Sequence, residues 1–100
     1  MAKEITLYSK EHCVQCIASE RELKKIGVNF KENGRRIVLG DTTYIHADAT
    51  SEENFEYIKT LDSNYTRAPI MAVVVDGEVT DHWSGFRPDK IQEHAIEVLV

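Results

Sequence analysis

The chain has 100 residues, of which 42% are hydrophobic and 29% are charged, and its formal net charge is −5 at pH 7. This length suits a single domain, 1–100, around one core, and the composition is that of a soluble folded protein. An acidic chain with dispersed basic residues is a poor candidate for binding nucleic acid or an anionic membrane, and no apolar run approaches the roughly 20 residues that span a bilayer.

The first two elements predicted along the chain are a strand and a helix. Residues 4–9 alternate apolar and polar side chains, which is the period of a half-buried strand. Residues 13–26 place apolar side chains on one helical face, and Gly27 follows as a residue that commonly ends a helix. The chain therefore begins with a β-α unit.

The segment from residue 28 to residue 47 has the least regular pattern. Residues 28–30 and 44–46 both look extended, and Asn33-Gly34 and Gly40-Asp41 are turn signals between them. We expect an extra β-hairpin or meander here, as a hairpin-like insertion around 31–44.

The next predicted elements are a helix and a hairpin. Residues 50–61 predict a helix, in which Thr50 and Glu53 have the spacing of a capping box. The apolar run 70–75 predicts a strand covered on both faces, and Asp76-Gly77 is a two-residue hairpin signal that leads to a second strand at 78–83.

The last predicted element is a C-terminal helix. Pro88 suits its first turn, and its apolar face is formed by Ile91, Ala95, Val98 and Leu99. The order β-α-β-α-β-β-α predicts an α/β fold with a four-stranded mixed sheet and three helices on its two faces.

The chemistry of the chain is indicated by its only two cysteines, in Cys13-Val14-Gln15-Cys16. A Cys-x-x-Cys between a strand and a helix is typical of a reversible dithiol/disulfide centre. The helix N-terminus and Lys10 favour a thiolate at Cys13 and a lowered pKa of its thiol, while the neighbouring Glu11 acts in the opposite direction and leaves the size of the shift open. We expect an exposed Cys13 to attack a target disulfide, and a more buried Cys16 to resolve the resulting mixed disulfide.

The cysteine pair is also compatible with roles outside redox chemistry. A bond across so short a loop constrains the unfolded chain little, so a stapling role is the weakest. A coincidental pair of cysteines remains open, as does zinc or an iron–sulfur cluster, although no second Cys-x-x-Cys exists. Zinc would need further ligands from the scattered histidines His12, His46, His82 and His94. The absence of an apolar leader and the reversible dithiol favour the cytoplasm.

Two further motifs come late in the chain. In Thr66-Arg67-Ala68-Pro69-Ile70, a proline directly precedes the buried strand, and an ordinary trans bond would be its local interpretation. In Trp83-Ser84-Gly85-Phe86-Arg87-Pro88-Asp89, the local interpretation is a turn and a helix start with a buried tryptophan.

The three motifs together resemble the NrdH-redoxins, small glutaredoxin-like proteins of the thioredoxin superfamily. The resemblance covers the chain except residues 31–44, and it implies a thioredoxin-like fold. It also implies a cis Pro69 beside the disulfide and strand addition by a substrate segment at Ala68. The residues it implies for substrate binding are Val14, Gln15, Ala68, Pro69, Trp83, Ser84, Gly85 and Phe86, with Lys10, Arg87 and Asp89 as a supporting network.

The resemblance also implies the partners. The chain would need no bound cofactor, would receive electrons from NADPH through thioredoxin reductase, and would pass them to the large subunit of class Ib ribonucleotide reductase or to another protein disulfide. We expect a monomer. A glutathione-dependent glutaredoxin is the first alternative, and a metal-binding or docking module without catalysis is the second. Two departures from the family pattern are the sequence around Lys10 and the position of Arg67.

Overall fold

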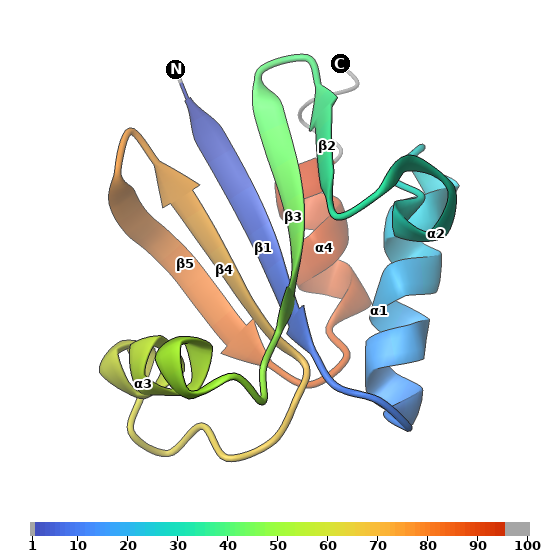
Figure 1. Ribbon diagram of the computed structural model, residues 1–100. Coiled ribbons are helices and arrows are strands. Elements are labelled where there is room, and N and C mark those ends of the chain that lie inside the picture. The colour runs from blue at the N-terminus through green and yellow to red at the C-terminus, as the bar shows by residue number, and fades with distance from the viewer. Residues whose placement is uncertain (1, 96–100) are drawn as a thin grey trace.

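Five strands form one mixed sheet in the computed structural model, which describes residues 2–95. In chain order the elements are β1 (Lys3–Ser9), α1 (Val14–Lys25), α2 (Phe30–Asn33), β2 (Arg36–Leu39), β3 (Thr42–Asp48), α3 (Glu52–Leu61), β4 (Ile70–Val75), β5 (Glu78–Ser84) and α4 (Pro88–Ala95). The strand order across the sheet is β2-β3-β1-β4-β5 (Figure 1). β1 and β3 are parallel, and the other neighbouring strands are antiparallel.

The interior strands β1 and β4 bury side chains on both faces of the sheet. Ile5 and Leu7 of β1 pack on one face, and Tyr8 packs on the other. β4 follows the same alternation, with Met71 in the first cluster and Ile70 in the second. This explains why its sequence is a continuous apolar run, as predicted for a strand covered on both faces.

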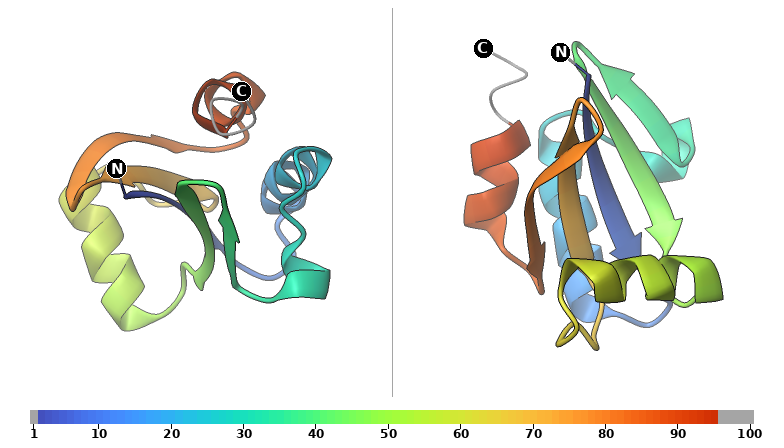
Figure 2. Two further views of the ribbon diagram at one scale, coloured as in Figure 1. Left: turned by 90° about the horizontal axis from the view of Figure 1, so that it is seen from above. Right: turned by 90° about the vertical axis from the view of Figure 1, so that its left-hand side faces the viewer.

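Helices cover the two faces of the sheet, as the sequence predicted. α1 and α4 contact each other on one face, where Leu23 and Ile91 join the larger core cluster. α3 lies across the opposite face and contributes Ile58 to the smaller cluster. The two views of Figure 2 show α1 and α4 together on one side of the sheet and α3 on the other.

The segment between α1 and β3 corrects two expectations. Residues 28–30 do not form a strand: Val28 is buried in the irregular connection after α1, and Phe30 begins the short helix α2. Asn29 caps this helix by accepting a hydrogen bond from the Glu32 backbone N–H at 3.2 Å. Asn33-Gly34 is therefore a helix end and not a hairpin turn.

The expected insertion instead contributes one hairpin, which turns at Gly40-Asp41 and pairs β2 with β3. Its first strand, β2, adds an edge to the sheet. Within residues 2–95 the sheet therefore has five strands where the sequence predicted four.

Helix boundaries also differ in detail from the prediction. Ser51, not Thr50, caps α3 by accepting the Asn54 backbone N–H at 3.2 Å, because Thr50 instead bonds to Asp48. Gly27 follows α1 with a φ of 99°, a backbone conformation that favours glycine at a helix end. The predicted positions Val98 and Leu99 lie outside the described residues. None of the helices within residues 2–95 is long and apolar enough to cross a membrane.

Candidate functional site

Cys13 and Cys16 form a disulfide at the start of α1. Cys13 is the N-cap residue, and its Sγ accepts the Cys16 backbone N–H at 3.1 Å. A donor fixed in this position stabilises negative charge on Cys13 Sγ once the disulfide is reduced. Cys16 is 2% exposed and Cys13 is 8% exposed, so Cys16 is the more buried residue, as expected, while Cys13 is less exposed than expected.

The segment before β4 lies against the disulfide. Cys13 Sγ is 3.7 Å from the Ala68 carbonyl oxygen. In the reduced protein, the Cys13 thiol can donate a hydrogen bond to this oxygen. The Ala68-Pro69 peptide bond is cis, as the resemblance implied, and Pro69 is buried. The segment is fixed from the end of β5, because Gly85 N–H donates to the Pro69 carbonyl at 2.9 Å and Ser84 Oγ donates to the Arg67 carbonyl at 3.3 Å.

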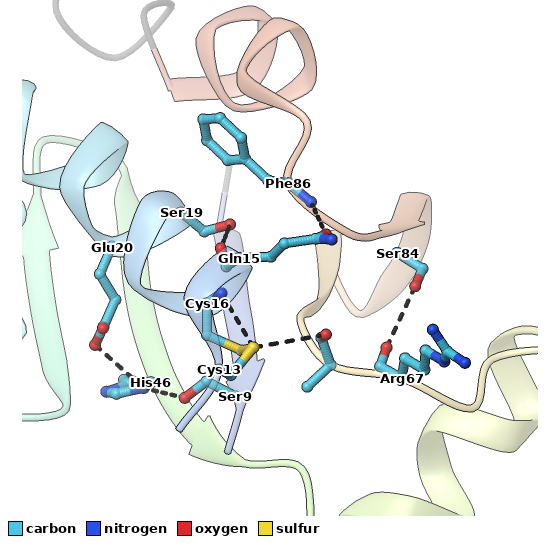
Figure 3. The surroundings of a disulfide bond; sticks show 11 residues. Ser9, Cys13, Gln15, Cys16, Ser19, Glu20, His46, Arg67, Ser84 and Phe86 are labelled. Carbon is cyan, nitrogen blue, oxygen red and sulfur yellow. Dashed lines mark hydrogen bonds and ion pairs between the residues drawn. A yellow bond between two sulfur atoms is a disulfide. The ribbon is translucent and has the colours of Figure 1, made fainter. Parts of the chain in front are cut away.

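Gln15 joins the cysteine segment to the turn that follows β5. Its Oε1 accepts the Phe86 backbone N–H at 3.0 Å (Figure 3). Gly85 has a φ of 84°, and a Cβ added there would lie 3.1 Å from the same Gln15 oxygen. The positive φ and the close approach to Gln15 both favour glycine at position 85. The structure thus brings all three sequence motifs together around one disulfide.

The other predicted residues differ in how near they lie to the sulfurs. Val14 is 81% exposed next to Cys13, so it is available to a partner. Lys10 lines the cavity beside the disulfide. Trp83 is 3% exposed in the larger core, and its ring stacks on His94 with 5.6 Å between centroids, so it presents almost no surface of its own. Phe86 is half-buried and packs against the same core.

The predicted supporting pair Arg87 and Asp89 forms an exposed ion pair at 3.0 Å. The hydrogen bonds between them raise the pKa of Arg87 and lower that of Asp89. Within residues 2–95, neither side chain forms a hydrogen bond or ion pair with the cysteine segment. The pair therefore lies on the surface at the start of α4 and not at the sulfurs.

A polar cavity of about 540 Å³ opens beside the disulfide. It is lined by both cysteines and by charged or titratable side chains that include Lys10, Glu20, Arg35 and His46. Sequence reasoning named His46 only as one scattered histidine and missed Ser9, Glu20 and Arg35. The carboxyl ends of the parallel strands β1 and β3 meet beside Cys13, but no local motif marks this pairing.

Possible metal ligands gather elsewhere in the described part of the chain. Asp81, Glu93 and His94 are the one group of three such side chains there whose ligand atoms lie within 4.8 Å of one another. Asp81 Oδ2 in this group already accepts hydrogen bonds from Lys90 and His94, each at 2.8 Å. The group belongs to β5 and α4 and excludes both cysteines.

Comparison with known proteins gives both relatives and fold neighbours. The chain is 30% identical over 87 residues to the glutaredoxin-like protein NrdH of Escherichia coli strain K12, which covers 87% of this chain and 83% of that protein. The solved NrdH-redoxin of Escherichia coli superposes with a TM-score of 0.55 at 25% identity, over 91% of this chain and 93% of that one. Fasciola hepatica thioredoxin superposes with a TM-score of 0.67 at 16% identity, over 96% and 80% of the chains, which confirms the thioredoxin-like fold. No protein-family model matches the chain.

Proposed function

The chain belongs to the NrdH family of glutaredoxin-like redox proteins, and from this premise we propose that it is a dithiol electron donor served by thioredoxin reductase. It would carry electrons from NADPH to protein disulfides, with the large subunit of class Ib ribonucleotide reductase as its principal target. It would act without a bound cofactor, because the Cys13–Cys16 pair itself stores the two electrons.

The observation that carries the proposal is the hydrogen bond between Gln15 Oε1 and Phe86 N–H. It ties the middle of the Cys-x-x-Cys segment to the motif that follows β5, so a partner that docks beside Cys13 meets both at once. The NrdH-redoxin of Escherichia coli, which this chain resembles in sequence and fold, is described as having a thioredoxin-like activity profile. This favours a thioredoxin-type electron source over glutathione.

The exchange chemistry follows from the positions of the two sulfurs. The reductase would deliver two electrons to the Cys13–Cys16 disulfide, and two protons would be taken up in total. The Cys13 thiolate would then attack a target disulfide, forming a mixed disulfide and releasing one target sulfur as a thiolate. Cys16 Sγ would attack Cys13 Sγ, which restores the internal disulfide and releases the second target sulfur. Cys13 suits the first attack because it is the less buried sulfur.

The target segment would dock along Ala68. A second hollow of about 310 Å³ borders Ala68 and Arg67 and is lined by Phe55 and Ile58 of α3. The Phe55 side chain is 48% exposed there, so an apolar side chain of the target has a surface to cover. An extended target segment would pair with the backbone at Ala68, and its flanking side chain would enter this hollow.

The test is an NADPH-consumption assay with insulin as the disulfide substrate. One series contains thioredoxin reductase, and a parallel series contains glutathione and glutathione reductase. We expect turnover with thioredoxin reductase that depends on Cys13, and little turnover with glutathione. Turnover in the glutathione series alone would contradict the proposal and favour a glutaredoxin. We also propose that the chain works in a reducing cytoplasm, where a dithiol of this kind is kept available for exchange.

The proposed target needs its own measurement. A Cys16→Ser variant mixed with the oxidised large subunit of class Ib ribonucleotide reductase should accumulate a covalent adduct that dithiothreitol removes. The matched control is Cys13→Ser, which should form none. If the variant forms adducts with insulin but none with the reductase subunit, the target assignment is wrong while the redox function stands.

A further inference from the structure

His46 shares the polar cavity with the disulfide, although no sequence motif or role in the proposed exchange includes it. It comes from β3, near the carboxyl end of the strand that runs parallel to β1. Figure 3 shows its ring beside Ser9, below the Cys13–Cys16 bond, with Glu20 approaching from α1. The histidine and the redox centre therefore come from different elements but face one space.

Side chains from several elements hold the His46 ring in place. Nε2 lies 2.5 Å from Ser9 Oγ, at the end of β1, and 3.5 Å from Glu20 Oε1. The Phe30 ring packs against the imidazole with 5.0 Å between centroids. The His46 side chain is only 15% exposed. A partly buried histidine between a hydroxyl and a carboxylate has the arrangement of a general base oriented by its neighbours.

The surrounding charges act on His46 in opposite directions. Burial lowers the pKa of His46, the Glu20 carboxylate raises it in part, and the Arg35 guanidinium lowers it further. The same cavity is also lined by the charged or titratable residues Lys10, Glu11, His12 and Asp48. At neutral pH the imidazole is therefore uncharged and has a lone pair that can accept a proton.

The resolving step has a proton to dispose of. Cys16 must lose its proton to attack, and at 2% exposure its sulfur has little contact with bulk water. We propose that His46, held between Ser9 and Glu20, accepts this proton through a water molecule in the shared cavity. The inference rests on the proposed exchange chemistry of Cys13 and Cys16, but not on the identity of the reductase or target.

Electrons and protons balance in this step. The Cys16–Cys13 bond forms as the bond between Cys13 and the target sulfur breaks. The target sulfur leaves with the bonding electron pair as a thiolate. The proton from Cys16 moves to the unprotonated ring nitrogen of His46, and the Glu20 carboxylate beside Nε2 stabilises the imidazolium. His46 then returns the proton to solvent or to the departing thiolate.

A small disulfide probe isolates this step from every protein partner. Reduced protein mixed with dithiobis(nitrobenzoic acid) releases one coloured thiolate when Cys13 attacks and a second when Cys16 resolves the mixed disulfide. We expect His46→Gln to slow the second phase at neutral pH by about tenfold. This is below the 10²–10⁴-fold range of general-base catalysis, because water in the open cavity accepts the proton in its place. The first phase should change much less.

The pH profile separates a proton acceptor from a structural support. With His46, the second-phase rate should be nearly flat between about pH 6.5 and 8.5, the ordinary pKa values of a histidine and a thiol. In His46→Gln the rate should instead rise with pH across this range. His82→Gln is the matched control, since His82 pairs with Tyr65 away from this cavity and its loss should leave the flat region intact.

The two neighbouring charges give an independent test if His46→Gln folds poorly. Glu20→Gln should move the acid edge of the second phase to lower pH, and Arg35→Gln should move it to higher pH. Where His46→Gln folds, both shifts should vanish in the double variants, whereas a direct effect of either charge on the thiols would persist. Where it does not fold, an acid edge that stays in place in both charge variants overturns the inference. Equal shifts with and without His46, or unchanged second-phase kinetics in His46→Gln, would overturn the inference.

Failure of the proposed function gives a different pattern. A chain that thioredoxin reductase does not reduce would still show two phases with the probe after chemical reduction. The role of His46 can therefore be rejected while the electron-donor function stands, and the converse also holds.

Discussion

The disulfide has two sides that are built in different ways. On the Ala68 side, formed by Gln15, Arg67–Pro69 and Ser84–Phe86, the contacts depend on backbone carbonyl and N–H groups. On the His46 side, formed by Ser9, Glu20, Arg35 and His46, side chains make the contacts around the ring. Backbone contacts need special residues such as glycine and proline, which leave a motif in the sequence. Side-chain contacts assembled by strand pairing leave none.

The largest expected effect is the loss of either sulfur, which removes the centre that both sides serve. Cys13→Ser should abolish disulfide reduction, because the attacking thiolate is gone. Cys16→Ser should leave the first attack intact and trap a mixed disulfide. Mass spectrometry of each variant after exposure to a disulfide substrate checks this. An adduct on Cys13→Ser but not on Cys16→Ser would reverse the roles of the two cysteines.

A large effect is also expected on the Ala68 side from Gly85→Ala. The positive φ should cost about 1–2 kcal/mol of unfolding free energy, and the new Cβ would press on Gln15 Oε1. Gly34→Ala is a matched control, since its φ is 87° and nothing lies within 4 Å of its added Cβ. We expect both variants to lose stability in urea, but only Gly85→Ala to lose reductase activity beyond that. Equal activities would show that the Gln15 contact does not position the cysteine segment.

A carboxylate remote from both sides provides a smaller effect on stability alone. Burial by itself would raise the pKa of Asp81, but hydrogen bonds from Lys90 and His94 lower it to about 2. Because the folded pKa lies below the ordinary 3.8, the stabilisation is present above about pH 4 and is lost as the pH falls toward 2. Asp81→Asn should therefore flatten the acid unfolding profile over this window, by about 1–2 kcal/mol. The rate at which Cys16 resolves the mixed disulfide should be unchanged in this variant, because Asp81 belongs to neither side of the disulfide.

The smallest effect concerns the His46 side and stability near neutral pH. Because burial lowers the pKa of His46 in the folded state, the unfolded chain binds the proton more tightly. Stability should therefore be full above about pH 6.5 and should fall as the pH drops through the pKa of the folded state. His46→Gln should remove this slope, worth less than about 1 kcal/mol. Urea unfolding midpoints at several pH values measure it, and an unchanged slope would point to another titrating group.

The order of most elements and the position of the redox centre were predictable from local sequence. Burial on one or both faces of a strand sets its pattern of apolar residues, whichever strands lie beside it. This pattern is visible in the alternation around Ile5 and Leu7 and in the apolar run from Ile70. The Gly85 motif likewise records a backbone constraint at one position. These are features that a short stretch of sequence determines.

The expectations that were wrong depend on competition between neighbouring segments. Val28 and Phe30 are apolar because they fill the core beside α1, and an alternating pattern cannot distinguish that from a strand. Thr50 does not cap α3, because its hydroxyl and its backbone N–H both donate hydrogen bonds to the Asp48 carboxylate. The fifth strand and the surroundings of His46 depend on which strands become neighbours, which is decided only by the whole fold.

The hydrogen bond from the Phe86 backbone N–H to the Gln15 side chain joins residues that are 71 positions apart. During synthesis on the ribosome, both cysteines emerge long before the turn that holds Gln15 in place. A nascent or truncated chain that lacks residue 86 thus carries two thiols without the completed site. Such thiols can pair with whatever sulfur they meet. Selective exchange begins only once residue 86 has joined the fold and donates its backbone N–H to Gln15.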